Sequence, residues 1–369
     1  MAALSTAFLS GALAERDADA FLHAGHTAEP ALRYCAGPLP DGEAAFVYAD
    51  GQATLCVSPA LDAAERSTVR TEDSAAAVRV NDAPVGEQAV AVLDECGVAG
   101  PVLTPRNVPH DAALYAENAG YDVASTDAVA RARETKDAAE RERTAAAQAA
   151  AVAGVERARE LLRTATVADG RLWRDGSDEP VTTRTLREAI DAAVRSNGAC
   201  PGVESRVVLG PEADDPGDRI EPGETVVVRV APREPGGYYG ALARTFVVEG
   251  EGGWERRAQL AVERALDSAL RELEAGVPAS TIREEVMVEC GAYGFADDAL
   301  PETAGHGVGL APRERPDLRS DDPLPAGTVL AISPAVTDPD GGEVALTDLV
   351  AVTEDGYESL ATTERSLRP

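Results

Sequence analysis

The sequence predicts an α+β protein made of two domains. The chain has 369 residues, which is enough to build two separate cores. Helical and strand-like segments are mixed without the regular strand–helix–strand rhythm of a doubly wound sheet. A charged junction at 131–136 is followed by an alanine-rich helical segment. We therefore expect an α/β domain over residues 1–130 and a larger domain over residues 131–369.

Short apolar strands and turn signals define the first domain. Asp50-Gly51 separates the apolar runs 44–48 and 54–57, and Asp-Gly between two such runs is typical of a β-hairpin. A helix, a strand and a second helix then follow; they are expected over 87–96, 101–104 and 110–119. This pattern ends near Val129, which sets the end of the domain.

The second domain begins with a helix start signal. Asp137, with Glu140 three residues later, forms a capping-box pattern before a helix that reaches about Leu162. A later helix has apolar residues at helical spacing and is followed by Gly276. The remaining predictions are helices over 185–197 and 254–274, and strands over 207–209, 225–230, 328–332 and 344–352.

Charge limits the classes of partner. The chain carries 34 Lys+Arg against 64 Asp+Glu, a formal net charge of −30, which repels phosphate backbones and argues against nucleic acid as a partner. No apolar stretch approaches the length of a membrane span, and the N-terminus lacks a signal-peptide pattern, so a cytoplasmic protein with no membrane partner is expected. Lys136 is the only lysine, and acid is spread along the chain, as in proteins of salt-accumulating archaea. We expect a halophilic protein that unfolds at low salt.

The five cysteines suggest neither a disulfide framework nor a zinc site. They are scattered singly, their total is odd, and no Cys-x-x-Cys pair occurs. We expect them to be buried small apolar residues.

His306 is the most informative of the four histidines. The chain has no glycine-rich phosphate loop with its lysine and no Gly-x-Ser-x-Gly elbow. His306 lies in the segment Gly-His-Gly-Val-Gly-Leu at 305–310, where the glycines allow close backbone approach and leave the imidazole accessible. On these residues alone, a structural histidine in a glycine-rich turn and a functional histidine are both open.

Four segments in order resemble the pita-bread metallopeptidases. The segment at 305–316 is similar to the family's Gly-His-Gly-x-Gly-Leu-x-x-His-Glu-x-Pro motif, and 238–246 to its Gly-Tyr-x-Ser-Asp-x-Thr-Arg-Thr-Phe strand. The segments at 324–334 and 341–350 resemble its last two motifs. This family contains prolidases, Xaa-Pro aminopeptidases, methionine aminopeptidases and creatinase. The resemblance implies a pita-bread C-terminal domain preceded by a creatinase/prolidase-type α/β N-terminal domain.

The resemblance implies two divalent metals, but most ligand positions differ here. The family holds its metals with Asp, Asp, His, Glu and Glu and uses a bridging water as nucleophile. Four of those five positions carry side chains that do not bind a hard dication as carboxylates do. In family order, the positions fall on Arg229, Ala241, His306, Ser333 and Thr347. We therefore expect no metal, no confident catalytic residue and a vestigial His306, with a divalent metal such as Mn, Co or Zn as the alternative.

Other family positions have also changed. Gly217 stands about where creatinase has the histidine that it uses as acid and base, and Arg313 replaces the later histidine. Arg313 and Tyr238 are expected to line the pocket. Asp348 is not expected to replace Thr347, because adjacent strand residues point to opposite faces. Three further acids, Asp338, Asp340 and Glu343, are expected in a solvated turn.

Arg229 admits two interpretations. One is an exposed arginine on an edge strand, since alternation is the default for half-buried strands. The other is a permanent cation in the space vacated by the metals, whose donors hold backbone carbonyls, Thr347, Ser333 or a bound carboxylate. Loss of the carboxylates and gain of an arginine would fit together, because several buried acids without metal are costly.

Three functions remain open on the sequence. The preferred one is a non-catalytic homologue of Xaa-Pro peptidases that retains the pocket for a small carboxylate, a peptide or a protein partner. The second is an active Xaa-Pro aminopeptidase or dipeptidase with a rearranged metal site. The third is a structural subunit that modulates an active paralogue. The resemblance also implies a homodimer.

Overall fold

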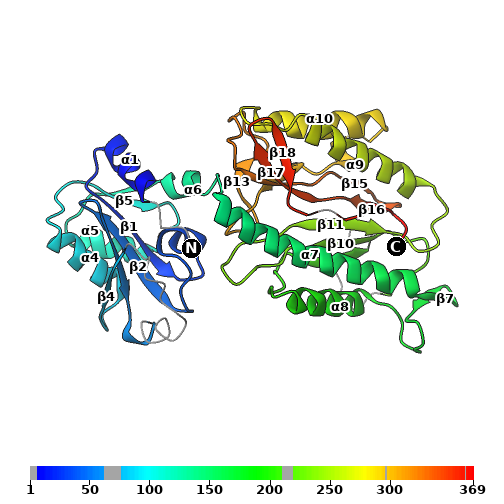
Figure 1. The fold of residues 1–369 in the computed structure, drawn as a ribbon, viewed down its shortest axis with the longest axis horizontal. Helices are drawn as coiled ribbons and strands as arrows, with labels where there is room; N and C mark the ends of the chain where they lie inside the picture. Colours follow the sequence, from blue (N-terminus) through cyan, green and yellow to red (C-terminus); the bar gives the residue numbers. More distant parts are fainter. Residues whose placement is uncertain (1–5, 62–75, 210–218, 296, 362) are drawn as a thin grey trace. The chain divides into compact units, whose positions relative to one another are not determined.

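A computed structural model describes residues 6–61, 76–209, 219–295, 297–361 and 363–369. The chain divides into two compact units, Met1–Arg133 and Glu134–Pro369, each of which is described by itself (Figure 1). The sequence had placed this division at 130/131. Helices and strands are mixed in both units, which confirms the α+β prediction.

Unit 1 contains a six-stranded sheet in the order β4-β3-β2-β1-β5-β6. The strands β1, β2 and β3 pair antiparallel, and the outer pairs are parallel. The predicted hairpin is confirmed: Asp50 and Gly51 have φ of 50° and 72°, the left-handed values of a two-residue turn. The strands are β1 Ala20–His26, β2 Glu43–Ala49, β3 Gln52–Val57, β4 Ala77–Val80, β5 Val102–Pro105 and β6 Val123–Thr126.

Helices cover both faces of this sheet. Phe21 and Phe46 pack with α1, α2 and α6 on one face, and Leu22 and Val47 pack with α4 and α5 on the other. Because both faces are buried, the central strands are apolar along most of their length. The helices are α1 Ala7–Arg16, α2 Pro30–Ala36, α4 Val85–Glu95, α5 His110–Asn118 and α6 Ala128–Ala132.

Unit 2 begins with the long helix α7. Its capping box is present: the Asp137 carboxylate accepts from the Glu140 N–H at 2.8 Å, and the Glu140 carboxylate accepts from the Asp137 N–H at 2.9 Å. The helices of this unit are α7 Ala138–Thr164, α8 Thr183–Ser196, α9 Trp254–Arg271, α10 Ala279–Ala292 and the short 3₁₀ turn η1 Asp297–Ala299. The helix α10 was not predicted from the sequence. Pro278 is the N-cap residue of this helix.

The strands of unit 2 form two main sheets and two hairpins. The sheet orders are β11-β10-β9 and β13-β12-β14-β17-β18, and the pairs β15-β16 and β7-β8 stand alone. The first group of strands is β7 Thr166–Ala168, β8 Arg171–Trp173, β9 Arg206–Leu209, β10 Val226–Val230 and β11 Leu242–Phe246. The second group is β12 Gly305–Gly307, β13 Glu314–Asp317, β14 Val329–Ile332, β15 Ala335–Asp338, β16 Gly342–Ala345, β17 Asp348–Thr353 and β18 Gly356–Ser359.

The single strand predicted over 344–352 is wrong. It is divided between β16 and β17 at Leu346-Thr347. The Leu346 N–H donates to the Pro334 carbonyl, and the Thr347 N–H donates to the Ala243 carbonyl of β11. The chain therefore leaves the β15-β16 hairpin at this point and bridges the two main sheets.

Helices cover the strands of unit 2 on two sides. Figure 1 shows α7 and α8 (green) on one side of the strands and α9 and α10 (yellow) on the other. Val228 and Phe246 pack in the core with α7 and α8, whereas Leu330 and Val350 pack with α9 and α10. No helix within the described ranges combines the length and apolar character that crossing a membrane requires.

The cysteine prediction is partly wrong. All five thiols are free, and Cys35, Cys56 and Cys290 are buried as expected. Cys96 and Cys200 are exposed, because both follow helix ends instead of lying on a core face.

Candidate functional site

One row of residues crosses both main sheets of unit 2. Arg206 of β9 lies opposite Arg229 of β10, which in turn lies opposite Ala243 of β11. Ala243 forms a β-bridge with Thr347. The Thr347 hydroxyl donates to the Ser333 hydroxyl at 3.0 Å. Since partners across antiparallel strands share a face, these five side chains lie on one side of the strands.

This row forms one wall of a cavity of about 700 Å³. Volumes of this size are typical of small-molecule sites. The cavity brings together six of the seven residues predicted for the pocket, namely Arg229, Ala241, His306, Arg313, Ser333 and Thr347. Its other charged lining residues are Arg187, Arg206, Glu204, Glu302 and Glu343.

Tyr238 is the exception. It does not line this cavity. Its hydroxyl donates to the Glu140 carboxylate at 2.7 Å, and it is 7% exposed. The residue therefore fixes the loop between β10 and β11 to the first turn of α7.

Arg229 forms an ion pair that the sequence did not predict. Its two terminal nitrogens donate to the two oxygens of Glu343, at 2.5 and 3.2 Å. The edge-strand interpretation is wrong, because β10 is the middle strand of its sheet and the Arg229 side chain is 22% exposed. The predicted partners of its donors, Thr347 and Ser333, bond to each other instead. The guanidinium thus holds a carboxylate from its own chain in a two-point contact.

Glu343 is consequently not a solvated turn acid. It lies on β16, its side chain is 16% exposed, and its N–H donates to the Thr225 hydroxyl at 3.3 Å. Asp338 and Asp340, by contrast, lie at the end of β15 and in the turn that follows, where the Asp338 carboxylate accepts from the Asp340 N–H. The Asp-Pro-Asp-Gly-Gly sequence at 338–342 is typical of a turn, and the strand β16 already begins at its last glycine.

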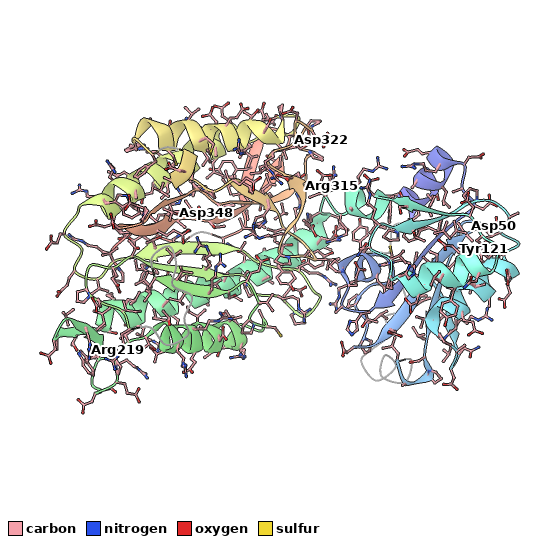
Figure 2. All side chains as sticks on the ribbon, turned by 180° about the vertical axis from the view of Figure 1, so that it is seen from behind. Asp50, Tyr121, Arg219, Arg315, Asp322 and Asp348 are labelled. Atoms are coloured by element: carbon pink, nitrogen blue, oxygen red, sulfur yellow. The ribbon has the colours of Figure 1, made fainter. Side chains whose placement is uncertain are left out.

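Asp348 faces away from Thr347, as predicted. Its carboxylate binds Arg244 at 2.7 Å and Arg365 at 2.6 Å, in the interior of unit 2 (Figure 2). Arg244 is completely buried and also donates to the backbone carbonyls of Ala243 and Thr347. This contact fixes the backbone of the row from the side opposite the cavity.

His306 lies on β12 and not in a turn. Its Nδ1 is 3.2 Å from the Gly307 carbonyl oxygen, which can only accept, so Nδ1 carries the proton and Nε2 remains an acceptor. Burial lowers the pKa of His306; the Gly307 carbonyl opposes this effect and the charge of Arg313 adds to it. The imidazole is therefore neutral at pH 7.

The glycines around His306 allow close backbone packing, as expected, and the His306 side chain is half-buried and lines the cavity. A Cβ on Gly307 would clash with the Arg315 carbonyl on β13. A Cβ on Gly309 would clash with the buried ion pair of Lys136 and Glu314, whose charged atoms are 2.8 Å apart. The only lysine of the chain is thus part of the packing behind this segment.

The donor set around His306 does not fit a pair of divalent metals. The neighbouring row residues offer a guanidinium, a methyl group and two hydroxyls, and Glu343 is already bound by Arg229. Within the described part of the chain, no group of three or more His, Cys, Asp and Glu side chains is placed to hold a metal ion. Gly217, the position compared with the acid–base histidine of creatinase, lies outside the described residues. Hard cations prefer several oxygen anions, which this row does not supply.

Two residues that line the candidate site were not predicted from the sequence. Arg206 precedes the predicted strand 207–209 and lies beside Arg229 only through strand pairing. Glu343 was assigned to a turn. The local sequence around Glu343 gave one indication of a strand, which is the polar residue followed by Val344 and Ala345. The side to which Glu343 points became clear only from the pairing of β16.

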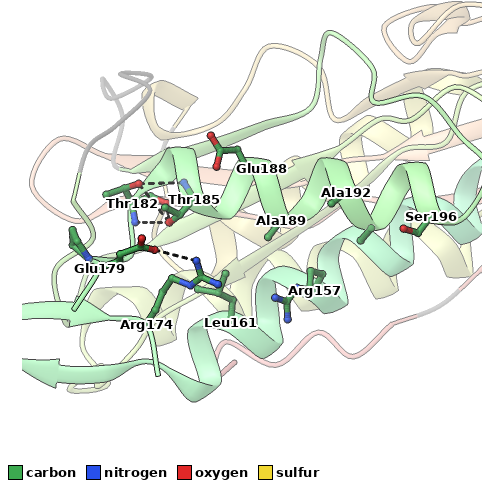
Figure 3. Close-up of a pocket in the computed structure, with 12 residues that line it drawn as sticks. Arg157, Leu161, Arg174, Glu179, Thr182, Thr185, Glu188, Ala189, Ala192 and Ser196 are labelled. Carbon is green, nitrogen blue, oxygen red and sulfur yellow. Dashed lines mark hydrogen bonds and ion pairs between the residues drawn. The ribbon is translucent and has the colours of Figure 1, made fainter. Parts of the chain in front are cut away.

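A second depression of about 770 Å³ lies between the outer faces of α7 and α8 and the β8 region. Figure 3 shows its arginine–glutamate pair, Arg174 and Glu179, and the Thr182–Thr185 capping contact of α8. None of the predicted site residues lines it. The cavity beside His306 is therefore the candidate site.

Comparisons with known proteins agree on one family. A sequence model of metallopeptidase family M24 matches residues 142–354, more than half of the chain. The Xaa-Pro dipeptidase of Pyrococcus furiosus is 29% identical over 227 residues, which are 58% of this chain and 62% of that protein. The Xaa-Pro dipeptidase of Pyrococcus horikoshii is 26% identical over 224 residues, 58% and 61% of the two chains. The chain thus spans about three fifths of the curated relatives that it matches.

Solved structures match over nearly the whole chain. An Xaa-Pro dipeptidase from Bacillus anthracis superposes with a TM-score of 0.85 at 18% identity and covers 98% of both chains. The prolidase from Pyrococcus horikoshii gives a TM-score of 0.83 at 20% identity and covers 98% of this chain and 99% of that one. At these identities the superpositions show the fold, which is the two-domain pita-bread architecture.

Proposed function

Because the chain belongs to metallopeptidase family M24, and no metal-binding group of side chains is found among the residues that the structure describes, we propose that it is a non-catalytic member that binds a small carboxylate or a peptide. The chain keeps the fold of Xaa-Pro peptidases and a cavity of about 700 Å³. One observation carries the proposal: the side chains that line the wall of that cavity are bonded to each other, as the Arg229–Glu343 ion pair and the Ser333–Thr347 hydroxyl bond.

The charge of the cavity supports an anionic ligand. Four arginines and three glutamates line it, whereas the whole chain carries 34 basic against 64 acidic side chains. The surface as a whole repels anions, so the reversal of the charge ratio at one concave site favours local anion binding. A peptide with a free carboxylate would be bound by a cation, by hydroxyl donors and by an apolar wall. All three are present in the row from Arg206 to Ser333.

The decisive experiment measures metal and hydrolysis on the same sample. Protein purified at high salt is incubated with Mn(II), Co(II) or Zn(II) and dialysed, after which bound metal is determined by elemental analysis. The same protein is mixed with the dipeptide Ala-Pro, whose cleavage is followed by chromatography and whose binding is followed by calorimetry. We expect less than one bound metal per chain, intact dipeptide and a measurable heat of binding.

An active M24 dipeptidase serves as the positive control for metal loading and cleavage. Two metals per chain together with hydrolysis of Ala-Pro would contradict the proposal. Such a result would mean that side chains other than those of the row bind the metals.

A further inference from the structure

The position of Arg206 indicates which kind of ligand the same cavity binds. This inference rests on the proposed function. Arg206 and Arg229 are directly opposite each other on adjacent strands and share the face that lines the cavity. Like charges in this arrangement destabilise a sheet unless a counter-charge is near. Glu343 neutralises one of them.

Arg206 has no ion pair among the residues that the structure describes. Arg206, Arg229 and Glu343 together carry a net charge of +1. One carboxylate placed between the two arginines would neutralise the group, and a guanidinium presents a planar set of donors that matches a carboxylate. Glu343 takes one N–H from each terminal nitrogen of Arg229, which leaves Arg229 three of its five donors, whereas no ion pair within the described ranges engages Arg206. Arg206 therefore supplies most of the free donors.

The other end of the row has different chemistry. Thr347 donates to Ser333, which leaves the Ser333 hydroxyl proton free to donate to a carbonyl oxygen. His306, on the same face as Ser333 through the pairing of β12 with β14, is a neutral imidazole whose Nε2 accepts. This end therefore suits a peptide carbonyl and a protonated amine, not a second anion.

The length of the row sets the length of the ligand. Three strand-to-strand steps separate Arg229 from Ser333, through Ala243 and Thr347. At about 4.8 Å per step this is roughly 14 Å between backbones. An extended peptide spans about 3.5 Å per residue, so roughly three residues fit once the side chains at both ends are allowed for. Ala241 and Ala243 line the cavity with small side chains, which leaves room for a peptide between Arg229 and Ser333.

We propose that this cavity binds a short peptide of about three residues with its free C-terminal carboxylate between Arg206 and Arg229, and with its amino end toward Ser333 and His306. Arg206 is the residue that recognises the carboxylate. Arg229 positions the site through Glu343 and adds positive charge.

Binding of defined peptides tests this proposal. Calorimetry on the full chain at one fixed high-salt concentration compares Ala-Ala-Ala with its C-terminal amide, and with Ala and Ala-Ala. We expect the free acid to bind at least tenfold more tightly than the amide, and the tripeptide more tightly than the two shorter ligands. Arg206→Gln should weaken binding of the free acid at least tenfold and leave the affinity for the amide unchanged.

A matched arginine serves as the control. Arg171 is an exposed strand arginine of β8 that lines neither cavity, so Arg171→Gln should bind the free acid as the unmodified protein does. Circular dichroism of both variants checks that they are folded. Arg206→Lys should restore part of the lost affinity, because it keeps the charge without the planar donors.

Three outcomes would overturn the inference. The first is equal affinity for the free acid and the amide, and the second is an Arg206→Gln variant that binds the free acid normally. The third is binding of inorganic phosphate that Arg206→Gln abolishes while no peptide binds, which would assign the cavity to a free oxyanion. Cleavage of the tripeptide, checked by chromatography of the same samples, would contradict the non-catalytic function and not the position of the carboxylate.

Discussion

Buried charge in unit 2 is held by dense hydrogen bonding at single residues. Arg244 is completely buried, and its guanidinium donates to the Asp348 carboxylate and to four backbone carbonyls. Burial lowers the pKa of Arg244, and Asp348 opposes that effect. A buried charge without such partners would be costly. Arg244 thus joins β11, the chain at Thr347 and the C-terminal segment behind the cavity.

Arg229 has surroundings unlike those of Arg244, although both are arginines. It is paired with a single carboxylate, faces a cavity and has a second arginine directly beside it. The difference follows from strand alternation, because Arg229 and Arg244 lie on opposite faces of the paired strands β10 and β11. One arginine stabilises the fold, and the other supplies charge to a site.

In unit 1, the pair of His23 and Glu29 makes a prediction about pH. The His23 side chain is fully buried, and its Nε2 is 2.6 Å from a Glu29 oxygen. Burial by itself would raise the pKa of the Glu29 carboxyl, but the hydrogen bond and charge of His23, with bonds from Leu32 and Asn107, lower that pKa to about 2. A carboxyl whose pKa is lowered on folding stabilises the protein above its unfolded pKa, and this stabilisation is lost as the pH falls toward its folded pKa.

We therefore expect Glu29→Gln to lower the free energy of unfolding at pH 7 by about 2 kcal/mol, after allowance for solvent screening. The difference from the unmodified protein should shrink from pH 5 downward and vanish near pH 2. Urea unfolding between pH 7 and pH 3 measures it. Glu117→Gln, at an exposed position of α5, is the control and should show no such pH-dependent difference. A constant difference across this range would mean that Glu29 does not titrate as its contacts require.

At the scale of elements, the site depends on how β10, β11, β12, β14 and the bridge at Thr347 are joined. The Ala243–Thr347 bridge is the only pairing that the described residues show between the two main sheets. Without it, Arg229 and Ser333 would belong to separate surfaces. The break between β16 and β17 therefore shapes the candidate site, since it frees Thr347 to pair with Ala243.

The N-terminus of α7 offers a stability test at this scale. The Asp137 side chain and the Glu140 side chain each satisfy a backbone N–H of the first turn, and Glu140 also accepts from Tyr238. We expect Asp137→Ala to destabilise the protein by about 1 kcal/mol, as is typical of a lost N-cap. Denaturant unfolding measures the loss, and Asp137→Asn should recover most of it. Equal stability of the alanine and asparagine variants would show that the cap contributes nothing here.

At the scale of the whole molecule, the chain shares its fold with proteins that differ from it at most positions. The chain superposes on an Xaa-Pro dipeptidase with a TM-score of 0.85 at only 18% identity. Many side-chain patterns satisfy the same packing of helices and strands, so low identity is compatible with one architecture. Metal binding, by contrast, depends on particular side chains at a few positions, and the row beside His306 carries a guanidinium, a methyl group and two hydroxyls there.

The net charge of −30 makes a prediction for the whole chain. At molar salt the screening length is about 3 Å, and at 0.1 M it is about 10 Å, so dilution strengthens the repulsion among the excess acidic groups. We expect the thermal midpoint to fall steeply between 2 M and 0.1 M KCl, with unfolding at the lowest salt. Circular dichroism during heating measures this midpoint.

Sucrose at matched osmolality separates screening from general solvent effects. It strengthens burial without screening charge, so it should not replace KCl. A midpoint that is unchanged on dilution, or that sucrose restores fully, would contradict a halophilic protein.

The sequence by itself predicted much of the local structure and the family. The Asp50-Gly51 hairpin and the Asp137 capping box were readable because a few neighbouring residues determine each of them. The family motifs located His306, Ser333 and Thr347, since they are short segments in a fixed order. The absence of carboxylates at those positions was equally visible, because it is a property of single residues.

Only the tertiary structure decided what replaced the carboxylates. Arg206, Arg229 and Glu343 come from three strands, and Glu343 is more than one hundred residues from Arg229 in the chain. Their contact is set by strand register and by the sheet bridge at Thr347, which are long-range features that no local pattern encodes. Side-chain alternation has a period of two, so a shift of one residue would have turned Arg229 into the core and Val228 toward the cavity. The sequence therefore determined which residues are available to the site. The tertiary packing determined which of them lie beside each other.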